Sequence, residues 1–341
     1  MTEAQAGIQP LLLITYPRSA SNLLVKVLNL PAQPNVVSVE RGGLFFHPAA
    51  ASMNSAGLLH RPHARWSEAE TETLQQKYQS SYDALQSLLD AAEQHGKMAV
   101  VREHAPFITS PHAVSAFLHV SPSDTALWRV EIPPRYRDAA CPPGLPPSLS
   151  VLPEEFLLRC QPAFLIRHPA LAFPSYYRLA QSFCDGDLAR MEKEMVPFAA
   201  LSSTLRWTRQ LYDWYTAAWT ALGQEDKKPV IIDADDMLRS PEVVLRFCDA
   251  VGLDQEKAQF HWEPLTEEER TALDPVRTKT CGTLHSSSGI ARGKSFEGLT
   301  MAGEAEKWKA EFGEQIGQRI EGWVRAAMPD YDYLVGKKLH S

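Results

Sequence analysis

The sequence has few cysteines and no closely spaced pair of them. Five occur among the 341 residues, without a Cys-x-x-Cys motif. This spacing argues against a disulfide framework and against a cysteine-based zinc site, because each needs cysteines in matched groups. We therefore expect reduced and mostly buried thiols. The five are Cys141, Cys160, Cys184, Cys248 and Cys281.

Long apolar runs and an excess of basic residues are also lacking. Residues 1–10 have neither the basic start nor the apolar stretch of a signal peptide, and the apolar run at residues 11–16 is too short to span a bilayer. These features predict a cytoplasmic protein without a membrane span. The net charge of −7 argues against nucleic acid as a partner, because nucleic-acid binding uses a basic face to displace counterions. Any anion site must therefore be local.

The chain does contain enough apolar sequence for a large core. With 341 residues and 44% hydrophobic content, we expect a single α/β domain over residues 1–341. Four buried-strand patterns, at residues 11–14, 98–101, 163–166 and 229–232, alternate with helical patterns. This alternation predicts a mostly parallel central sheet flanked by helices on both faces.

Three other segments have distinct patterns. Residues 67–94 predict a polar helix, and residues 133–153 are too rich in proline for regular structure, so they suit a lid or a wall of a pocket. Residues 202–222 follow a helical pattern with four aromatic residues, which favours a core helix over an aromatic binding stripe. These aromatic residues are Trp207, Tyr212, Trp214 and Trp219.

The turn after the first strand is the first candidate ligand site. In an open parallel sheet, ligands bind beyond the carboxyl ends of the strands, where a helix N-terminus offers free N–H groups to an anion. Arg18 supplies a cation at this turn, and the small side chains of Ser19, Ser21 and Asn22 suit phosphate oxygens. The same sequence also fits a plain capped helix, with Ser19 or Ser21 as the N-cap and Arg18 in solvent.

The usual nucleotide loop, Gly-x-x-x-x-Gly-Lys-Ser/Thr, is absent, and its nearest match at residues 289–295 is one residue short. An ordinary ATPase or GTPase is thus disfavoured. Residues 15–23 instead resemble the 5′-phosphosulfate loop of the sulfotransferases that use 3′-phosphoadenosine 5′-phosphosulfate (PAPS). The resemblance implies a P-loop fold, a cation beside the transferring sulfonate, and main-chain amides around the 5′-phosphate. The residues that it assigns to this loop are Arg18, Ser19, Ala20, Ser21 and Asn22.

A second motif, at residues 167–177, follows the third strand pattern. Arg167 stands at the strand end and Ser175 in the following helix pattern, and a guanidinium fork with a hydroxyl suits a phosphate. The pair resembles the family's 3′-phosphate motif, which has the same interval. Alternatively, Arg167 pairs with a carboxylate and Ser175 is an incidental helix serine. Two motifs in the family's order, each after a strand, favour the family interpretation.

His104, at the end of the second strand pattern, is the candidate general base. Sulfonate transfer to an alcohol requires removal of the hydroxyl proton, which suits an imidazole with a pKa near the operating pH. The family has its catalytic histidine in a similar setting. This resemblance makes Arg102 a second cation near the sulfonate, with Glu103 on the opposite side of the strand. The alternative is a strand-end histidine that bonds to a neighbour.

Two C-terminal segments also resemble parts of the family. The segment 233–236, with three aspartates, follows the fourth strand pattern, and it either has a structural role or forms a solvated turn. The Arg-Gly-Lys sequence at residues 292–294 and the Trp-Lys pair at 308–309 resemble elements near the 3′-phosphate. On this basis Arg292 and Gly293 join the candidate donor site.

Two positions depart from the family loop, whose glycine is Ala20 here and whose adenine-stacking tryptophan is Leu23. A methyl at Ala20 obstructs a close backbone approach if the backbone there is left-handed, and leucine cannot stack as an aromatic ring does. Three functions therefore compete. They are sulfonate transfer from PAPS to a hydroxyl of a small lipophilic molecule, a repurposed elimination, cyclisation or isomerisation of an anionic substrate without PAPS, and a non-catalytic nucleotide-binding scaffold.

The acceptor pocket is expected from two insertions, at about residues 36–95 and 106–160, which match no family motif. The transfer reaction requires no metal. His60 and His63 are the nearest candidate metal ligands, and an isolated loop pair of this kind is more often structural. The aromatic residues that suit either the acceptor pocket or the core are Phe45, Phe46, Trp66 and Trp128.

Overall fold

The structure is a computed structural model that describes residues 8–120, 127–137 and 141–339. Within these residues, five strands form one parallel sheet in the order β2-β3-β1-β4-β5. The predicted α/β class with a parallel central sheet is thus confirmed. The strands are β1 (Leu11–Thr15), β2 (Val36–Val37), β3 (Met98–His104), β4 (Gln161–Ile166) and β5 (Val230–Asp233).

The strands form where apolar residues are buried on both faces of the sheet. Along β1, Leu11 and Leu13 join one core cluster, whereas Leu12 and Ile14 join the other, because successive side chains point to opposite faces. All four predicted strands are confirmed. The sequence did not indicate β2, since two residues are too few to show a pattern.

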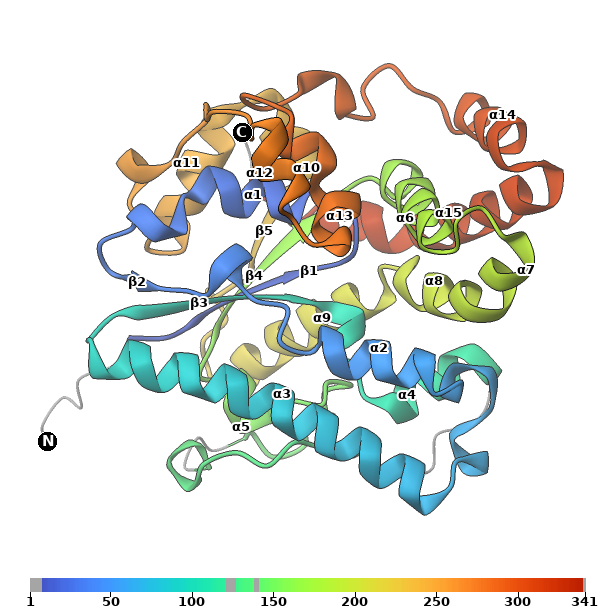
Figure 1. The fold of residues 1–341 in the computed structure, drawn as a ribbon. Coiled ribbons are helices and arrows are strands. Elements are labelled where there is room, and N and C mark those ends of the chain that lie inside the picture. Colours follow the sequence, from blue (N-terminus) through green and yellow to red (C-terminus); the bar gives the residue numbers. More distant parts are fainter. Residues whose placement is uncertain (1–7, 121–126, 138–140, 340–341) are drawn as a thin grey trace, which may run out of the picture.

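Helices cover both faces of this sheet. Figure 1 shows α1 and α11 on one side and α3 and α9 on the other, and each pair contributes to a separate core cluster. The helices are α1 (Ser21–Leu28), α2 (His47–Ser55), α3 (Glu68–Gln94), α4 (Pro111–His119), α5 (Glu154–Leu157), α6 (Pro169–Phe183), α7 (Leu188–Arg190), α8 (Val196–Ser202), α9 (Arg206–Ala221), α10 (Ala234–Arg239), α11 (Pro241–Ala250), α12 (Glu267–Thr271), α13 (Pro275–His285), α14 (Met301–Phe312) and α15 (Glu314–Val335).

The two long helical patterns form the helices that the sequence predicts. Helix α3 begins after Ser67, whose side chain accepts from the Glu70 N–H while the Glu70 carboxylate accepts from the Ser67 N–H. Such a capping box stabilises a helix start by about 1 kcal/mol. The four aromatic residues of α9 are each at most 7% exposed, which confirms the core interpretation.

The proline-rich segment is irregular apart from the short 3₁₀ helix Pro134–Tyr136, as predicted, and residues 138–140 of it lie outside the described part. It packs against the sheet-covering helices, where the Trp214 indole N–H donates to the Pro146 carbonyl at 3.1 Å.

The remaining sequence predictions concern the N-terminal segment, a membrane span and the cysteines. Residues 1–7, the start of the segment compared with signal peptides, are outside the described residues. Among the described helices, none is long and apolar enough to cross a membrane. The five cysteines are free, and all except Cys141 are buried, which confirms that expectation.

Candidate active site

The turn after β1 has an unusual backbone. Arg18 and Ala20 both have positive φ angles, 66° and 69°. Ala20 is the N-cap residue of α1, and no side chain caps this helix, so the alternative in which Ser19 or Ser21 is the cap is wrong. The start of α1 thus lacks a side-chain cap and lines a cavity, an arrangement that favours an anion.

Arg102 fixes the side chains at this helix start. Its Nη1 donates to Asn22 Oδ1 at 2.7 Å and to Ser21 Oγ at 3.2 Å, and the residue is 1% exposed. The register of the sheet brings this about, because β1 and β3 are parallel neighbours and both end here. A cation thus lies directly beneath the loop that the sequence marks as an anion site.

A second group of basic residues converges beside the loop. Arg18 Nε donates to Ser175 Oγ at 3.0 Å, and Arg167 Nη1 donates to the Arg18 carbonyl at 2.9 Å. Arg167 Nη2 also donates to the Lys294 carbonyl at 3.2 Å. In the described part of the chain no carboxylate forms an ion pair with Arg167, which disfavours the plain salt-bridge alternative.

The pKa shifts of Arg18, Arg167 and Lys294 indicate partly buried cations that lie close together. Burial lowers the pKa of Arg18, and the charge of Arg167 lowers it further. Burial likewise lowers the pKa of Arg167. For Lys294, burial and the charges of both arginines lower the pKa. Three like charges in a partly desolvated space are unfavourable together, so binding of a polyanion would relieve their repulsion.

The base candidate His104 ends β3 directly opposite Thr15. Thr15 Oγ1 donates its one proton to the Glu103 carbonyl at 3.0 Å, and the same oxygen lies 2.6 Å from His104 Nδ1. Nδ1 then donates to Thr15, and when the imidazole is neutral, Nε2 is the ring nitrogen with the lone pair. This neutral tautomer is the form that accepts a proton in general base catalysis.

Glu103 points to the other side of β3, as the strand alternation predicts. The carboxyl group is fully buried, and its Oε1 accepts from the Phe46 N–H at 3.3 Å. Burial raises the pKa of Glu103 to about 8, although backbone N–H groups partly oppose this shift. Glu103 thus anchors the segment before α2 rather than facing the cations.

One cavity of about 910 Å³ connects these groups. Its cationic end includes the loop after β1, and its apolar end lies between α2, α6 and α8. Ser19 is completely buried and does not line the cavity, and Ser175 reaches it only through its bond to Arg18. The candidate site residues that line the cavity are Arg18, Ala20, Ser21, Asn22, His104 and Arg167.

The C-terminal candidates behave differently from one another. Arg292 and Gly293 lie in the 3₁₀ helix Arg292–Lys294, but Gly293 is exposed and away from the cavity lining, whereas Lys294 lines it. The side chain of Arg292 is outside the described part. The prediction for the Trp-Lys pair is wrong, because Trp308 is a core residue, 1% exposed, and Lys309 pairs with acidic residues of α14 and α15.

The acidic residues after β5 serve as scaffold rather than as a solvated turn. Asp233 is 3% exposed and accepts from the Tyr331 hydroxyl at 2.8 Å, while Asp235 accepts from the Phe296 N–H at 2.8 Å. They join the C-terminal segment, including α15, to the end of β5.

Helix α13 closes the cationic end, which the sequence did not indicate. Arg277 of this helix pairs with Glu40 at 2.5 Å, and Lys279 donates to the Ser182 carbonyl at 2.5 Å. The Thr280 carbonyl accepts from Arg18 Nη1 at 2.8 Å. Figure 1 shows α13 and α2 on opposite sides of the sheet edge where β1 and β3 end.

The expected aromatic candidates are elsewhere in the molecule. Phe46 is fully buried in the core, and Phe45, Trp66 and Trp128 pack against the same core cluster. From the first insertion, α2 and the segment before it line the cavity, and from residues 106–160, Phe107 does. The described residues contain no group of three or more His, Cys, Asp or Glu side chains able to hold a metal ion. His63 instead packs against His112, with ring centroids 3.8 Å apart.

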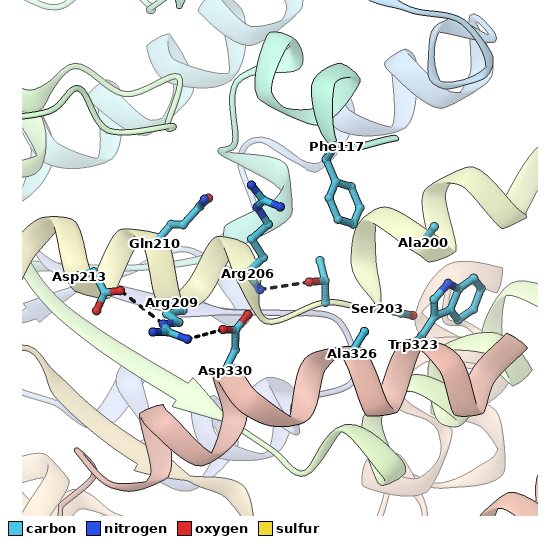
Figure 2. A pocket seen from close by; sticks show the side chains of 11 residues that line it. Phe117, Ala200, Ser203, Arg206, Arg209, Gln210, Asp213, Trp323, Ala326 and Asp330 are labelled. Atoms are coloured by element: carbon cyan, nitrogen blue, oxygen red, sulfur yellow. Dashed lines mark hydrogen bonds and ion pairs between the residues drawn. The ribbon is translucent and has the colours of Figure 1, made fainter. Parts of the chain in front are cut away.

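A second cavity of about 500 Å³ lies among α4, α8, α9 and α15. Figure 2 shows that its central cation, Arg209, is bonded to two carboxylates, Asp330 and Asp213. The corresponding N···O distances are 2.8 Å and 3.5 Å. Arg209 is already paired with carboxylates, whereas the first cavity lies at the carboxyl ends of β1 and β3, where an open parallel sheet binds its ligands, so the first cavity is the better candidate.

The parallel sheet, with a cluster of cations lining a cavity at its carboxyl edge, defines an α/β protein with a cationic cavity. The chain is 39% identical over 339 residues to Sulfotransferase ppzF of Metarhizium rileyi, with 96% of each chain covered. It is 38% identical over 341 residues to Sulfotransferase ppzF of Metarhizium majus, again with 96% of each covered. These two relatives show that the chain belongs to the sulfotransferases.

Two further comparisons were made. No protein-family model matches the chain. The solved sulfotransferase domain from the Synechococcus PCC 7002 olefin synthase is 15% identical, with a TM-score of 0.39 over 88% of this chain and 91% of that one.

Proposed function

We propose that the protein transfers a sulfonate group from PAPS to a hydroxyl of a small lipophilic molecule, with His104 as general base. The observation that carries this proposal is that one cavity contains both a cluster of cations and a histidine beside apolar side chains. Three mutually repelling cations, Arg18, Arg167 and Lys294, occupy one end, and His104, whose Nδ1 is bonded to Thr15, lines the cavity beside the apolar end.

The residues present suit PAPS as the donor substrate, which supplies an activated sulfonate on its 5′-phosphate. Arg167 and Lys294 would hold the 3′-phosphate, and the start of α1 with Ser21 and Asn22 would hold the 5′-phosphate. Arg18 lies between them and would stabilise charge on the bridging oxygen. Ala20 leaves the backbone in the left-handed conformation that a glycine would adopt more easily.

In the transfer step, His104 Nε2 takes the proton of the acceptor hydroxyl while the acceptor oxygen bonds to sulfur. The bond between sulfur and the 5′-phosphate oxygen breaks, and adenosine 3′,5′-bisphosphate leaves with that electron pair. Thr15 holds the imidazole at Nδ1, which leaves Nε2 as the nitrogen for this step. Arg102 and Arg18 offset the negative charge that leaves with the nucleotide.

The test separates chemistry from binding. His104→Ala should lower single-turnover sulfonate transfer from PAPS by 10²-fold or more, with adenosine 3′,5′-bisphosphate binding almost unchanged. Equal turnover by the variant would refute the role of His104.

The second candidate function is a reaction of an anionic substrate without PAPS, which Ala20 and Leu23 favour. Leu23 lines the cavity and gives the nucleotide base no aromatic ring on α1. Such an enzyme would convert its substrate in the absence of PAPS, and would bind adenosine 3′,5′-bisphosphate no better than adenosine 5′-phosphate.

A further inference from the structure

One face of α2 forms a wall of the apolar end of the cavity. His47, Ala51 and Asn54 all line the cavity, and their spacing of four and three residues places them on the same side of the helix. The rest of this helix packs against the core and α3. The acceptor molecule of the proposed reaction would therefore lie along α2.

The wall runs away from the reacting centre. The ring of His47 lies 5.3 Å from that of Phe107, and the ring of His104 lies 5.0 Å from the same phenylalanine. The start of α2 and the proposed base thus contact the same phenylalanine ring. Asn54 comes seven residues after His47 in the helix, which is a rise of about 10 Å.

The carboxamide of Asn54 is held in one orientation. Its Nδ2 donates to the Glu194 carbonyl at 2.8 Å, and the reverse orientation would place two oxygens against each other. Its Oδ1 is buried and has no hydrogen-bond partner among the described residues. A buried acceptor without a partner costs about 1–3 kcal/mol, so this oxygen requires an explanation.

The surroundings of Asn54 indicate what kind of group would bond to its Oδ1. Glu194 belongs to a π-helical turn, Met191–Met195, a rare element that often occurs at functional sites. Apolar side chains line the remainder of this end, namely Leu179, Phe183, Met195 and Phe198. In such surroundings a donor from a bound molecule would complete the hydrogen bonding of Asn54.

We propose that Asn54 determines acceptor specificity, and this proposal rests on the function proposed above. Its Oδ1 accepts a hydrogen bond from an O–H or N–H group of the acceptor, about 10 Å along α2 from the start of that helix. The acceptor is then a slender apolar molecule with a reactive hydroxyl at one end and a hydrogen-bond donor at the other.

Three probes with the same biphenyl core test this inference. The first, p,p′-biphenol, has a hydroxyl at each end. The second, p-phenylphenol, has no hydroxyl at the end that would reach Asn54. The third, the monomethyl ether of p,p′-biphenol, has at that end an oxygen that cannot donate a hydrogen bond. Binding of each probe to the protein saturated with adenosine 3′,5′-bisphosphate is measured by calorimetry. We expect p,p′-biphenol to bind about tenfold more tightly than the other two, the value of one buried hydrogen bond.

The variant Asn54→Leu keeps the side-chain volume and removes both polar atoms, so it should abolish the preference for p,p′-biphenol. Ser55→Ala is the matched control, because Ser55 is the next residue on α2 and is exposed. The comparison of probes on the unaltered protein needs no variant and remains valid if Asn54→Leu does not fold. Equal affinities for the three probes, or no binding of any of them, would overturn the inference.

The same assay distinguishes failure of this inference from failure of the proposed function. If adenosine 3′,5′-bisphosphate binds but the probes are not discriminated, the role of Asn54 is refuted and the donor site stands. If the nucleotide itself does not bind, the proposed function is refuted, and the inference about the acceptor is refuted with it.

Discussion

Ala20 offers a sharp test of the loop geometry, because a glycine there should not destabilise the protein. An alanine to glycine change in a helix ordinarily costs about 0.5–1 kcal/mol. At Ala20, with φ of 69° and ψ of 21°, the methyl group instead costs about 1–2 kcal/mol in the left-handed region. The greater freedom of glycine in the unfolded chain offsets about 0.4–1 kcal/mol of that gain. The net effect of Ala20→Gly is then between about 0 and 1.5 kcal/mol of stabilisation.

Thermal denaturation measures this difference. Ala84→Gly is the control, because Ala84 is exposed in the middle of α3, where glycine should lower the free energy of unfolding by about 1 kcal/mol. We expect the melting temperature of Ala20→Gly to equal or exceed that of the unaltered protein, and that of Ala84→Gly to fall. If Ala20→Gly falls as far as the control, the left-handed conformation at Ala20 is refuted.

Three further predictions follow from the site. Thr15→Val removes the bond that fixes the His104 tautomer, so kcat should fall at least tenfold while nucleotide affinity stays constant, and an unchanged kcat would contradict this. Burial raises the pKa of Glu103 to about 8, so the folded protein keeps this carboxyl protonated at pH values where the unfolded chain has lost the proton. The free energy of unfolding should therefore decline as pH rises from about 4.5 to 8. Glu103→Gln should flatten that decline in urea unfolding. Arg277→Ala breaks a partly exposed ion pair with Glu40, so nucleotide affinity should fall at most about fivefold, and a larger loss would indicate direct contact.

The sequence indicated the parallel sheet and the positions of the loop residues because these depend on local patterns. Four apolar runs buried on both faces predict strands, and parallel strands bring their carboxyl ends to one edge. Arg18, Arg167 and His104 follow those runs, so their convergence on one cavity follows from the topology.

Other parts of the site depend on long-range packing, which local patterns do not show. The strand pattern stopped at Val101 because charged residues follow, although β3 continues through buried Arg102 and Glu103 to His104. Helix α13 has few apolar residues, and its place over the cavity depends on contacts with distant parts of the chain, including its bonds to Glu40 and Arg18.

The acceptor end was also hidden from the sequence. Its lining comes from separate stretches of chain, which include α2, α6 and α8, whereas Phe46 lies in the core and Phe45, Trp66 and Trp128 pack against it. Apolar side chains of a pocket and of a core look alike in a sequence, because both are set by the same hydrophobic patterns.

The central claim is that the cations around Arg167 bind a nucleotide with a 3′-phosphate. Calorimetry should compare adenosine 3′,5′-bisphosphate with adenosine 5′-phosphate, on the unaltered protein and on Arg167→Ala. Loss of charge-assisted bonds worth about 1.5–3 kcal/mol predicts a 10- to 150-fold weaker affinity in the variant and a similar preference for the bisphosphate in the unaltered protein. Equal affinities for the two nucleotides, or no binding by folded protein, would contradict the account.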